Sequence, residues 1–454
     1  MLSWITSGLH LSRRVSPLSF RLPLREAALV LVLACAGLAA VVAAGGVLAW
    51  DGGFYFFLTL QEARPITMHH RVGLWPMTRL LLAGSEFTEN VPQLAVLFGS
   101  ALALVPLLAL AASLASLKGD KAWLRIWPVL GILIAPLPSQ VCLVAESAMA
   151  MQLFWAAWAA LAGGTRLWRL AVVAVVATWM FTLHPVAGPL LLLLAGTLVY
   201  FWWKMRSRLA ALTAAVLAAA GCWRILLLLL EPAYERDQAL AEGTWRLAWD
   251  NLAGFPLLLS LAMLAQAVAL FRPGVWPVRV SLALWLVAVP AGLLWALDPA
   301  RWAWSLNFRF ALFPLTALLA LVACAHIRRP GSRSSLALPA IVFATVLCAQ
   351  ALTWHRLVAD LRAELQGAPG LLLQPAWTAS TPLDHWTLPV LAVVVQGREP
   401  STLVVRDAED LTGAGVRLTK TETLRLEQGW FRLESLRVQL SRPPGAAMES
   451  GDGA

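Results

Sequence analysis

The chain has 454 residues, of which 59% are hydrophobic and only 13% charged, and its mean hydropathy is +0.72. This composition excludes a soluble globular protein and indicates a polytopic α-helical membrane protein. The formal net charge of +10 does not predict nucleic-acid binding, because the basic residues fall in short loops between apolar runs.

Apolar runs follow a short N-terminal segment, residues 1–25, which we place in the cytoplasm. The first run is too long for the apolar part of a signal peptide, so we interpret it as a retained helix. A helix needs about 20 apolar residues to cross a bilayer, and on this basis we expect about eleven membrane helices within residues 26–354. The two short runs around His184 can alternatively form one broken or re-entrant hairpin. The runs are 26–50, 94–117, 125–145, 148–163, 170–183, 186–203, 209–230, 252–271, 280–297, 311–326 and 336–354.

The loops between these runs alternate in charge, and cytoplasmic loops of membrane proteins are enriched in Lys and Arg. This rule places the N-terminus inside and the C-terminus outside. Most acids fall on the outer side, which also carries a long first loop over residues 51–93. We therefore expect any chemistry to take place on the outer side. The basic inner loops contain Arg25, Lys118, Lys121, Arg125, Arg166, Arg169, Lys204, Arg206, Arg208, Arg272, Arg279, Arg328, Arg329 and Arg333.

After residue 354 the charges return and the pattern alternates between apolar and polar residues. Segments such as TLPVLAVVVQG, STLVVRD, VRLTKTETLRLE and WFRLESLRVQL are typical of strands. We expect a small β-rich outer domain over residues 355–442 and a disordered tail over residues 443–454.

The segment AWDGGFYFFLTLQEARPITMHHR begins at the outer end of the first apolar run. Asp51 follows Trp50, a residue type that anchors at the level of the lipid headgroups, so its carboxylate can meet a lipid headgroup. Gly52 and Gly53 allow the backbone to turn or to approach a ligand closely. The aromatic residues that follow predict an interfacial helix, and GLWPMTRLL predicts a second one that is interrupted at Pro76.

WDGGFYFFL, together with the Arg64 and Pro65 that follow and with LWPMTRLLL, resembles the opening motif of the GT-C glycosyltransferases, especially mannosyltransferases that use a polyprenyl-phosphate sugar. The resemblance covers residues 50–82 and the general layout. It implies many membrane helices, active-site loops on the outer side, sometimes a C-terminal outer domain, and an acid of the first outer loop, here Asp51, as catalytic base or as the group that orients the acceptor. The chain departs from the pattern because no acidic pair follows Asp51 and HHRVGLWP lacks the aromatic-Pro-Leu sequence, which leaves donor and acceptor open.

Sugar transfer from a polyprenyl phosphate with inversion needs a carboxylate that takes the proton of the acceptor hydroxyl, and cations that neutralise the leaving phosphate. Asp51 is the first candidate for the base. Glu62 is the second, about three helical turns further along. The alternative for Glu62 is a solvated loop acid.

Candidate cations and further binding residues lie on the same side. Arg224 stands inside GCWRILLLLL, a costly position that indicates phosphate binding or a side chain that snorkels to the headgroups. Glu146 can line the acceptor cavity or cap its own helix, and His184 can line a cavity or form part of a turn before Pro185. The remaining candidates for substrate binding are Arg71, Arg301, Arg309, His70 and Tyr55.

Metal chemistry is not predicted by any ligand pattern. His69 and His70 are adjacent, so on a helix they point to different faces and form a poor metal pair. The five cysteines have unrelated spacings, which indicate neither a disulfide framework nor a zinc site. Dependence on a divalent metal stays open.

Three functions compete for this sequence. The first is a glycosyltransferase of a bacterial inner membrane that moves a sugar from a lipid-linked donor to a glycan, lipid or protein acceptor on the outer side. The second is a transporter or flippase for a lipid-linked glycan, a class that normally carries charges near the bilayer middle. The third is a noncatalytic membrane assembly subunit, in which the outer β-rich domain would bind the partner. The sequence favours the first, partly by analogy with the family, and fixes no oligomeric state.

Overall fold

A computed structural model describes most of the membrane region and parts of the C-terminal region. The described residues are 17–49, 51–67, 71–88, 90–141, 143, 145–164, 166–205, 208–230, 252–272, 274–299, 309–327, 335–367, 371–373, 388, 391, 394–395, 403–405, 421–427 and 430–436.

The described residues form thirteen α-helices, which makes the fold all-α in its main part. The helices are α1 (Pro17–Ala43), α2 (Asp51–Glu62), α3 (Trp75–Ser85), α4 (Val91–Ser116), α5 (Ile126–Val129), α6 (Glu146–Gly163), α7 (Leu167–Leu183), α8 (Ala187–Met205), α9 (Arg208–Leu230), α12 (Phe255–Phe271), α13 (Val275–Ala296), α15 (Arg309–His326) and α16 (Ala337–Gly367).

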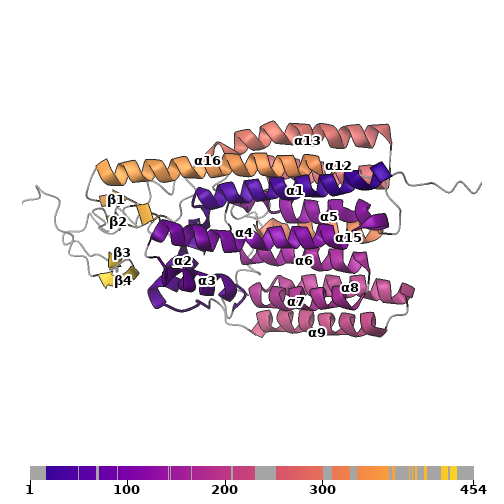
Figure 1. The fold of residues 1–454 in the computed structure, drawn as a ribbon, viewed down its shortest axis with the longest axis horizontal. Coiled ribbons are helices and arrows are strands. Elements are labelled where there is room, and N and C mark those ends of the chain that lie inside the picture. Colours follow the sequence, from indigo (N-terminus) through magenta and orange to yellow (C-terminus); the bar gives the residue numbers. More distant parts are fainter. Residues whose placement is uncertain are drawn as a thin grey trace, which may run out of the picture.

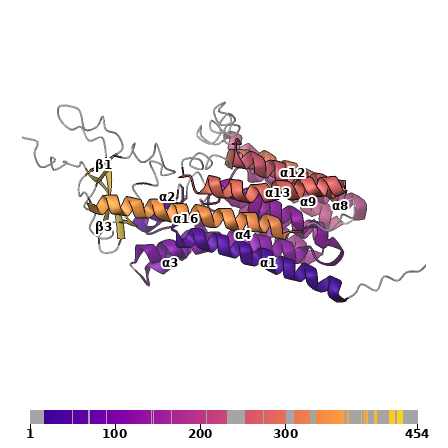
Figure 2. The same cartoon turned by 90° about the horizontal axis from the view of Figure 1, so that it is seen from above.

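The long helices are aligned along one axis of the molecule, with α13 at one edge and α9 at the opposite edge (Figure 1). Helices α1 and α16 lie side by side in both views (Figures 1 and 2). Gly37 permits this contact, because a Cβ there would stand 3.3 Å from Phe343 and Leu347. The short helices α2 and α3 lie at one end of the bundle, together with the strands (Figure 1). This end is the one that the sequence predicts to be the outer side.

Six of the described helical segments are long and apolar enough to cross a membrane. They are Arg25–Ala43, Val91–Ser116, Gly119–Ser139, Arg208–Leu230, Val275–Ala296 and Ala337–Glu364, and four shorter apolar helices accompany them. A multi-pass membrane protein is therefore supported. All eleven predicted runs contain helical residues, but fewer than eleven are long enough to cross unaided. Helix α6 belongs to neither group by length and composition, and its neighbours enclose it along nearly its whole length.

The predicted run 125–145 overlaps the candidate span Gly119–Ser139, but this span changes its helix type along its length instead of forming one regular α-helix. The span consists of a 3-10 segment (Gly119–Arg125), α5, a π-helical turn (Leu130–Ile134) and a second 3-10 turn (Leu137–Ser139). Pro136 has no N–H to donate to the Ile132 carbonyl, so the helical ladder breaks there. Gln152 replaces that donor, with 3.3 Å between its Nε2 and the Ile132 oxygen. Irregular backbone is tolerated at this depth because protein surrounds it.

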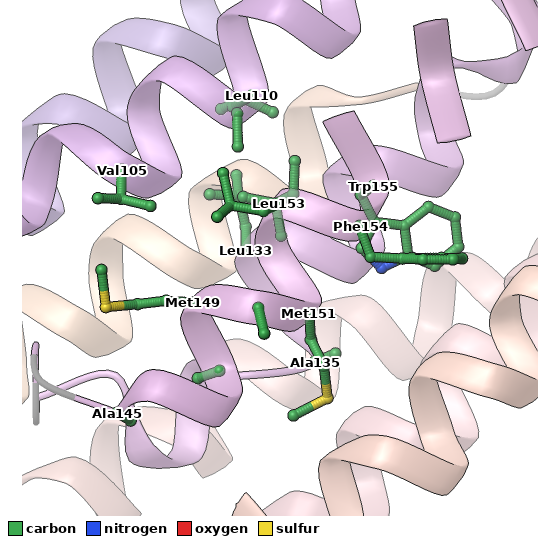
Figure 3. Close-up of a cluster of buried hydrophobic side chains, with 14 of the residues drawn as sticks. Val105, Leu110, Leu133, Ala135, Ala145, Met149, Met151, Leu153, Phe154 and Trp155 are labelled. Atoms are coloured by element: carbon green, nitrogen blue, oxygen red, sulfur yellow. The ribbon is translucent and has the colours of Figure 1, made fainter. Parts of the chain in front are cut away.

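The core packs most tightly where α6 meets this broken segment. Phe154 and Trp155 project from α6 into the cluster of Figure 3, with their rings edge to face and 5.4 Å between centroids. Gly131 lies directly against Trp155, and a Cβ at Gly131 would stand only 1.8 Å from the indole Nε1. The π-helical turn therefore leaves space for an aromatic ring that a larger residue at position 131 would exclude.

Basic side chains cap helix ends at the opposite end of the bundle from α2. Lys121 donates to the Ala162 carbonyl at 2.6 Å, near the end of α6. Arg125 donates to the Leu117 carbonyl at 2.7 Å, and Arg169 donates to the Ser116 carbonyl at 3.3 Å, both at the end of α4. Cations at helix C-termini satisfy unpaired carbonyls and oppose the negative end of the helix dipole. Three of the basic residues that predict inner loops thus also hold the bundle together.

The C-terminal region differs from the expected β-rich domain. Helix α16 continues to Gly367, so the first residues of the expected outer domain are helical. The described residues of TLPVLAVVVQG, which lie within 388–395, are helical rather than extended. The other three segments do contain strands. Two separate two-stranded sheets form, with β1 (Leu371–Leu373) parallel to β2 (Leu403–Val405) and β3 (Thr421–Glu427) antiparallel to β4 (Trp430–Leu436). The described residues therefore form no single β domain, and the predicted tail over 443–454 lies outside them.

Candidate functional site

The candidate site begins where α1 gives way to α2. The chain turns at Gly45, which has φ 80°, passes through the 3-10 turn Gly46–Leu48 and enters α2 at Asp51. Gly46 is packed too closely for a side chain, because a Cβ there would stand 3.0 Å from the Val141 carbonyl oxygen. Gly52 and Gly53 lie inside α2, so they do not supply the turn that the sequence suggests. The break before Asp51 therefore depends on Gly45 and Gly46.

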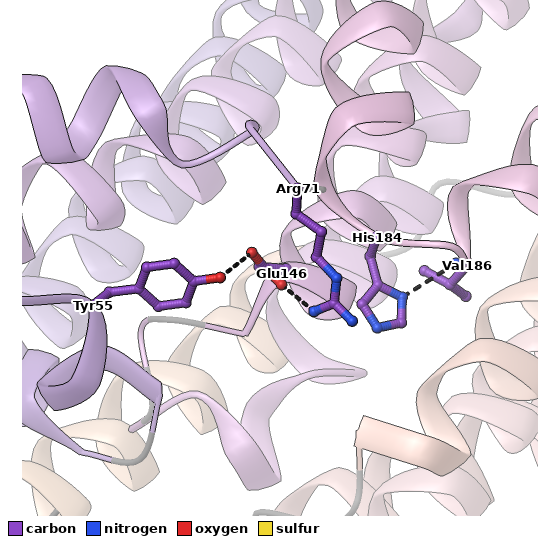
Figure 4. A network of polar contacts seen from close by, with 5 residues as sticks. All are labelled: Tyr55, Arg71, Glu146, His184 and Val186. Carbon is purple, nitrogen blue, oxygen red and sulfur yellow. Dashed lines mark hydrogen bonds and ion pairs between the residues drawn. The ribbon is translucent and has the colours of Figure 1, made fainter. Parts of the chain in front are cut away.

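Three side chains from distant parts of the sequence meet beside this junction (Figure 4). The Tyr55 hydroxyl donates to Glu146 Oε1 at 2.8 Å, across 91 residues of sequence. Arg71 Nη1 forms a short ion pair with Glu146 Oε2, across 75 residues. Glu146 is the first residue of α6, so one carboxylate joins α2, the α2–α3 connection and α6.

The Tyr55–Arg71–Glu146 cluster is enclosed by the protein. The Glu146 side chain is 6% exposed and the Arg71 side chain 15%. Burial raises the pKa of Glu146 above its ordinary value, while Arg71 and the hydrogen bond from Tyr55 act in the opposite direction. Burial, followed by the nearby Glu146 carboxylate, raises the pKa of Tyr55. The tyrosine therefore remains a hydrogen-bond donor throughout the physiological pH range.

Asp51 lies near this cluster and is more accessible than Glu146. It is only partly buried, one helical turn before Tyr55 on the same face of α2. Its charge contributes to the raised pKa of both Tyr55 and Glu146, which places the two carboxylates within electrostatic range of each other. The site thus combines two acids with one arginine, and the arginine is bound by the buried acid.

The α7–α8 turn closes the other side of Arg71. The Gly73 N–H donates to the Thr182 carbonyl at 3.0 Å, and Trp179 Nε1 donates to the Gly73 carbonyl at 2.9 Å. These bonds hold the chain beyond Arg71 against the end of α7, and Figure 4 shows His184 next to Arg71. His184 Nδ1 accepts the Val186 N–H at 3.1 Å. His184 therefore forms part of the turn before Pro185, one of the two roles that the sequence allows for it. It also lies beside the Tyr55–Arg71–Glu146 cluster.

Other predicted residues are not brought into the cluster. Glu62 ends α2 and pairs with Arg64 at 2.7 Å, and these side chains are 35% and 74% exposed. Only 4% of the surface of Arg224 is exposed, and its guanidinium carbon lies 5.9 Å from the centroid of the Phe181 ring. Its side chain therefore turns toward α7 instead of extending along the outer surface of the bundle. Arg224 is held next to the α7–α8 turn rather than against Glu146.

Several predicted residues fall outside the described part of the chain. His70 and Arg301 are among them, as are Trp50 and His69. Arg309 is the first residue of α15, but its side chain is outside the described set. Among the side chains that the structure describes, no group of three or more His, Cys, Asp or Glu could hold a metal ion.

The pairing of Tyr55 and Arg71 with Glu146 is the main feature that the sequence did not reveal. All three residues are candidates in the sequence, but the pattern carries no signal that links positions 55, 71 and 146. An acid at the start of an apolar helix is one partial signal, because burial of such a group requires a cationic partner. No protein family, curated protein or solved structure matches the chain.

Proposed function

We propose that the chain is an integral-membrane glycosyltransferase that moves a sugar from a polyprenyl-phosphate donor to a hydroxyl acceptor on the outer side, with Asp51 as general base. The observation that supports this proposal best is the accessible Asp51 carboxylate beside the buried Tyr55–Arg71–Glu146 cluster. A general base such as Asp51 must be accessible to the substrate. An acid that holds other side chains in place, as Glu146 does, is better buried and paired with a cation.

The reaction would proceed by direct displacement. Asp51 takes the proton of the acceptor hydroxyl as that oxygen attacks the anomeric carbon of the sugar. The bond between this carbon and the phosphate oxygen breaks, and the polyprenyl phosphate leaves with the electron pair. A cation must stabilise the charge on the leaving phosphate. Arg71 is the cation within the cluster, while Arg224 lies beside Phe181 on α7.

Glu146 has a positioning role in this proposal. Because Arg71 and Tyr55 occupy both of its carboxylate oxygens, Glu146 is poorly placed to accept a proton from a substrate. It fixes Tyr55 on α2, and Tyr55 lies one turn from Asp51. The buried acid thereby holds the segment that presents the accessible one.

The broken segment 119–139 favours a transporter as the second candidate. Discontinuous membrane helices mark the binding sites of many transporters. Here the break carries a buried polar pair, in which Gln152 Nε2 lies 3.0 Å from Gln140 Oε1. A transporter would move labelled lipid-linked substrate across a vesicle without changing its covalent form.

Substitution of Asp51 by Asn tests the proposed base. We expect sugar transfer, measured with a panel of lipid-phosphate sugars, to fall by about 100-fold or more, the usual contribution of general-base catalysis. Glu62→Gln is the matched control because it removes a charge from the same helix at an exposed position. Full activity of the Asp51 variant would exclude Asp51 as the base. Flux without transfer in the wild type would favour the transporter.

A further inference from the structure

An open apolar groove runs between α8 and α9, away from the candidate site. Its volume is 450 Å³, which lies within the range of about 300–1,000 Å³ that is typical of ligand sites. The groove is lined by Leu192, Ala195, Gly196, Val199, Ala211, Ala214, Ala215 and Ala218.

The groove is closed at one end and open at the other. At the closed end α8 and α9 touch, because a Cβ on Gly221 would stand 2.8 Å from the Gly188 carbonyl oxygen. Further along α8, toward the start of α9, the groove is open, because an added Cβ at Gly196 would meet nothing within 4 Å. Small residues let helices approach closely, as they do at Gly188 and Gly221. A ligand would therefore enter from the end at which α9 begins.

The lining of the groove is apolar and therefore suits a hydrocarbon ligand. All eight lining residues are apolar, and α9 is one of the helices long and apolar enough to cross a membrane. The groove extends over eight residues of each helix, and the seven steps between the first and the last of them span roughly 10 Å at 1.5 Å per residue. A linear alkyl chain fits this shape better than a compact ligand does.

A cation stands at the open end. Arg208 is the first residue of α9 and is exposed. It lies three residues before Ala211 and seven before Ala215, so these three positions share one face of the helix. The first turn of α9 contains no acid. The groove thus combines an apolar channel with a positive charge at its mouth, which is the pattern expected for a lipid with an anionic head.

We propose that this groove binds one acyl chain of an anionic glycerophospholipid, whose phosphate contacts Arg208. The lipid belongs to the leaflet at the start of α9, which is the inner leaflet in the orientation predicted by the basic loops. The site is separate from the proposed transferase site, since Arg224 faces Phe181 on α7 rather than the groove. The inference therefore does not depend on the proposed catalytic activity.

Native mass spectrometry of the full chain, released from nanodiscs of equal parts phosphatidylcholine and phosphatidylglycerol, tests the proposal. We expect the wild type to retain phosphatidylglycerol in preference to phosphatidylcholine. Gly196→Trp, which fills the groove, should abolish the retention, whereas Leu229→Trp on the exposed surface near the other end of α9 should not. Arg208→Gln should weaken retention about fivefold, the effect of one basic residue near an anionic surface, and Arg279→Gln should leave it unchanged.

Each variant is first checked for its thermal unfolding midpoint and for its elution volume on gel filtration. Equal phosphatidylglycerol retention by folded Gly196→Trp and wild type would overturn the proposal. Preferential retention of added polyprenyl phosphate would instead identify a different lipid as the occupant. A dimer that Gly196→Trp converts to a monomer would show that a second copy of the chain covers the groove.

Discussion

Glu146 accepts a hydrogen bond from Tyr55 at 2.8 Å, although 91 residues separate them in the sequence. Arg71 binds the second oxygen of the same carboxylate. The contact fixes α2, the helix that begins with Asp51, to the first turn of the buried helix α6. The stability of this small cluster and the position of the proposed base are therefore linked.

Removal of the Glu146 charge should destabilise the protein. Glu146→Gln removes the charged partner of Arg71 in a largely buried ion pair, and breaking such a pair typically costs about 3 kcal/mol or more. The free energy of unfolding, measured by SDS titration, checks this value. The control is Glu62→Gln, which breaks an exposed pair and should cost less than about 1 kcal/mol. Equal losses in the two variants would show that the Arg71–Glu146 pair is not buried in solution.

Tyr55 should resist ionisation in alkaline solution. Its pKa is raised above the ordinary value of 10.0, first by burial and then by the Glu146 carboxylate. Because the folded-state pKa is the higher one, the stability contributed by Tyr55 is fully present below pH 10.0 and is lost as the pH rises from there toward the folded-state pKa. Ultraviolet difference titration of wild type against Tyr55→Phe follows the phenolate directly. A Tyr55 signal that titrates at the ordinary pKa in the folded protein would contradict the prediction.

Substitution of a buried glutamine by methionine should destabilise the protein at one position and stabilise it at another. Gln152→Met removes the donor to the Ile132 carbonyl and should destabilise the protein by about 1–3 kcal/mol. Gln350 is fully buried in α16, and neither of its amide atoms has a hydrogen-bond partner among the described residues. Gln350→Met should therefore stabilise the protein by about 1 kcal/mol, since it replaces an unsatisfied amide with an apolar group of similar size.

Thr353→Val serves as a control for the Gln350 experiment on the same helix. Thr353 donates to the Ala296 carbonyl at 2.9 Å, so its loss should destabilise the contact between α16 and α13. Destabilisation by Gln350→Met would instead mean that its amide has a bound partner in solution.

Two glycines should differ in their tolerance of alanine. Gly131→Ala forces a methyl group into Trp155 and should cost about 1–3 kcal/mol through overpacking. Gly196→Ala meets no atom within 4 Å and should stabilise α8 by roughly 0.5–1 kcal/mol through its higher helix propensity. Thermal unfolding in detergent compares the two variants. A neutral Gly131→Ala would show that the π-helical turn relaxes to make room for the methyl group.

The sequence by itself determined the class of the protein and the position of most helices. Long apolar runs predict membrane helices because the lipid interior contains no water that could bond the backbone N–H and C=O groups. A helix pairs these groups within its own segment, so the constraint acts locally along the chain. The same reasoning located α7 and α8 as separate helices on either side of His184. It did not reveal the change of helix type near Pro136, where the composition stays apolar but proline has no N–H for the helical hydrogen bond.

Only the tertiary structure decided which polar residues meet. Asp51, Tyr55, Arg71, Glu146 and His184 are all visible as candidates in the sequence, yet their spacing says nothing of their contacts. Tyr55 and Arg71 reach Glu146 because α2 and the segment before α3 fold over the start of α6. Glu62 and Arg224 were equally plausible in the sequence, but one pairs with Arg64 at the surface and the other packs on Phe181. Apolar periodicity is a local property, whereas the partner of a buried charge is chosen by the packing of helices far apart in the chain.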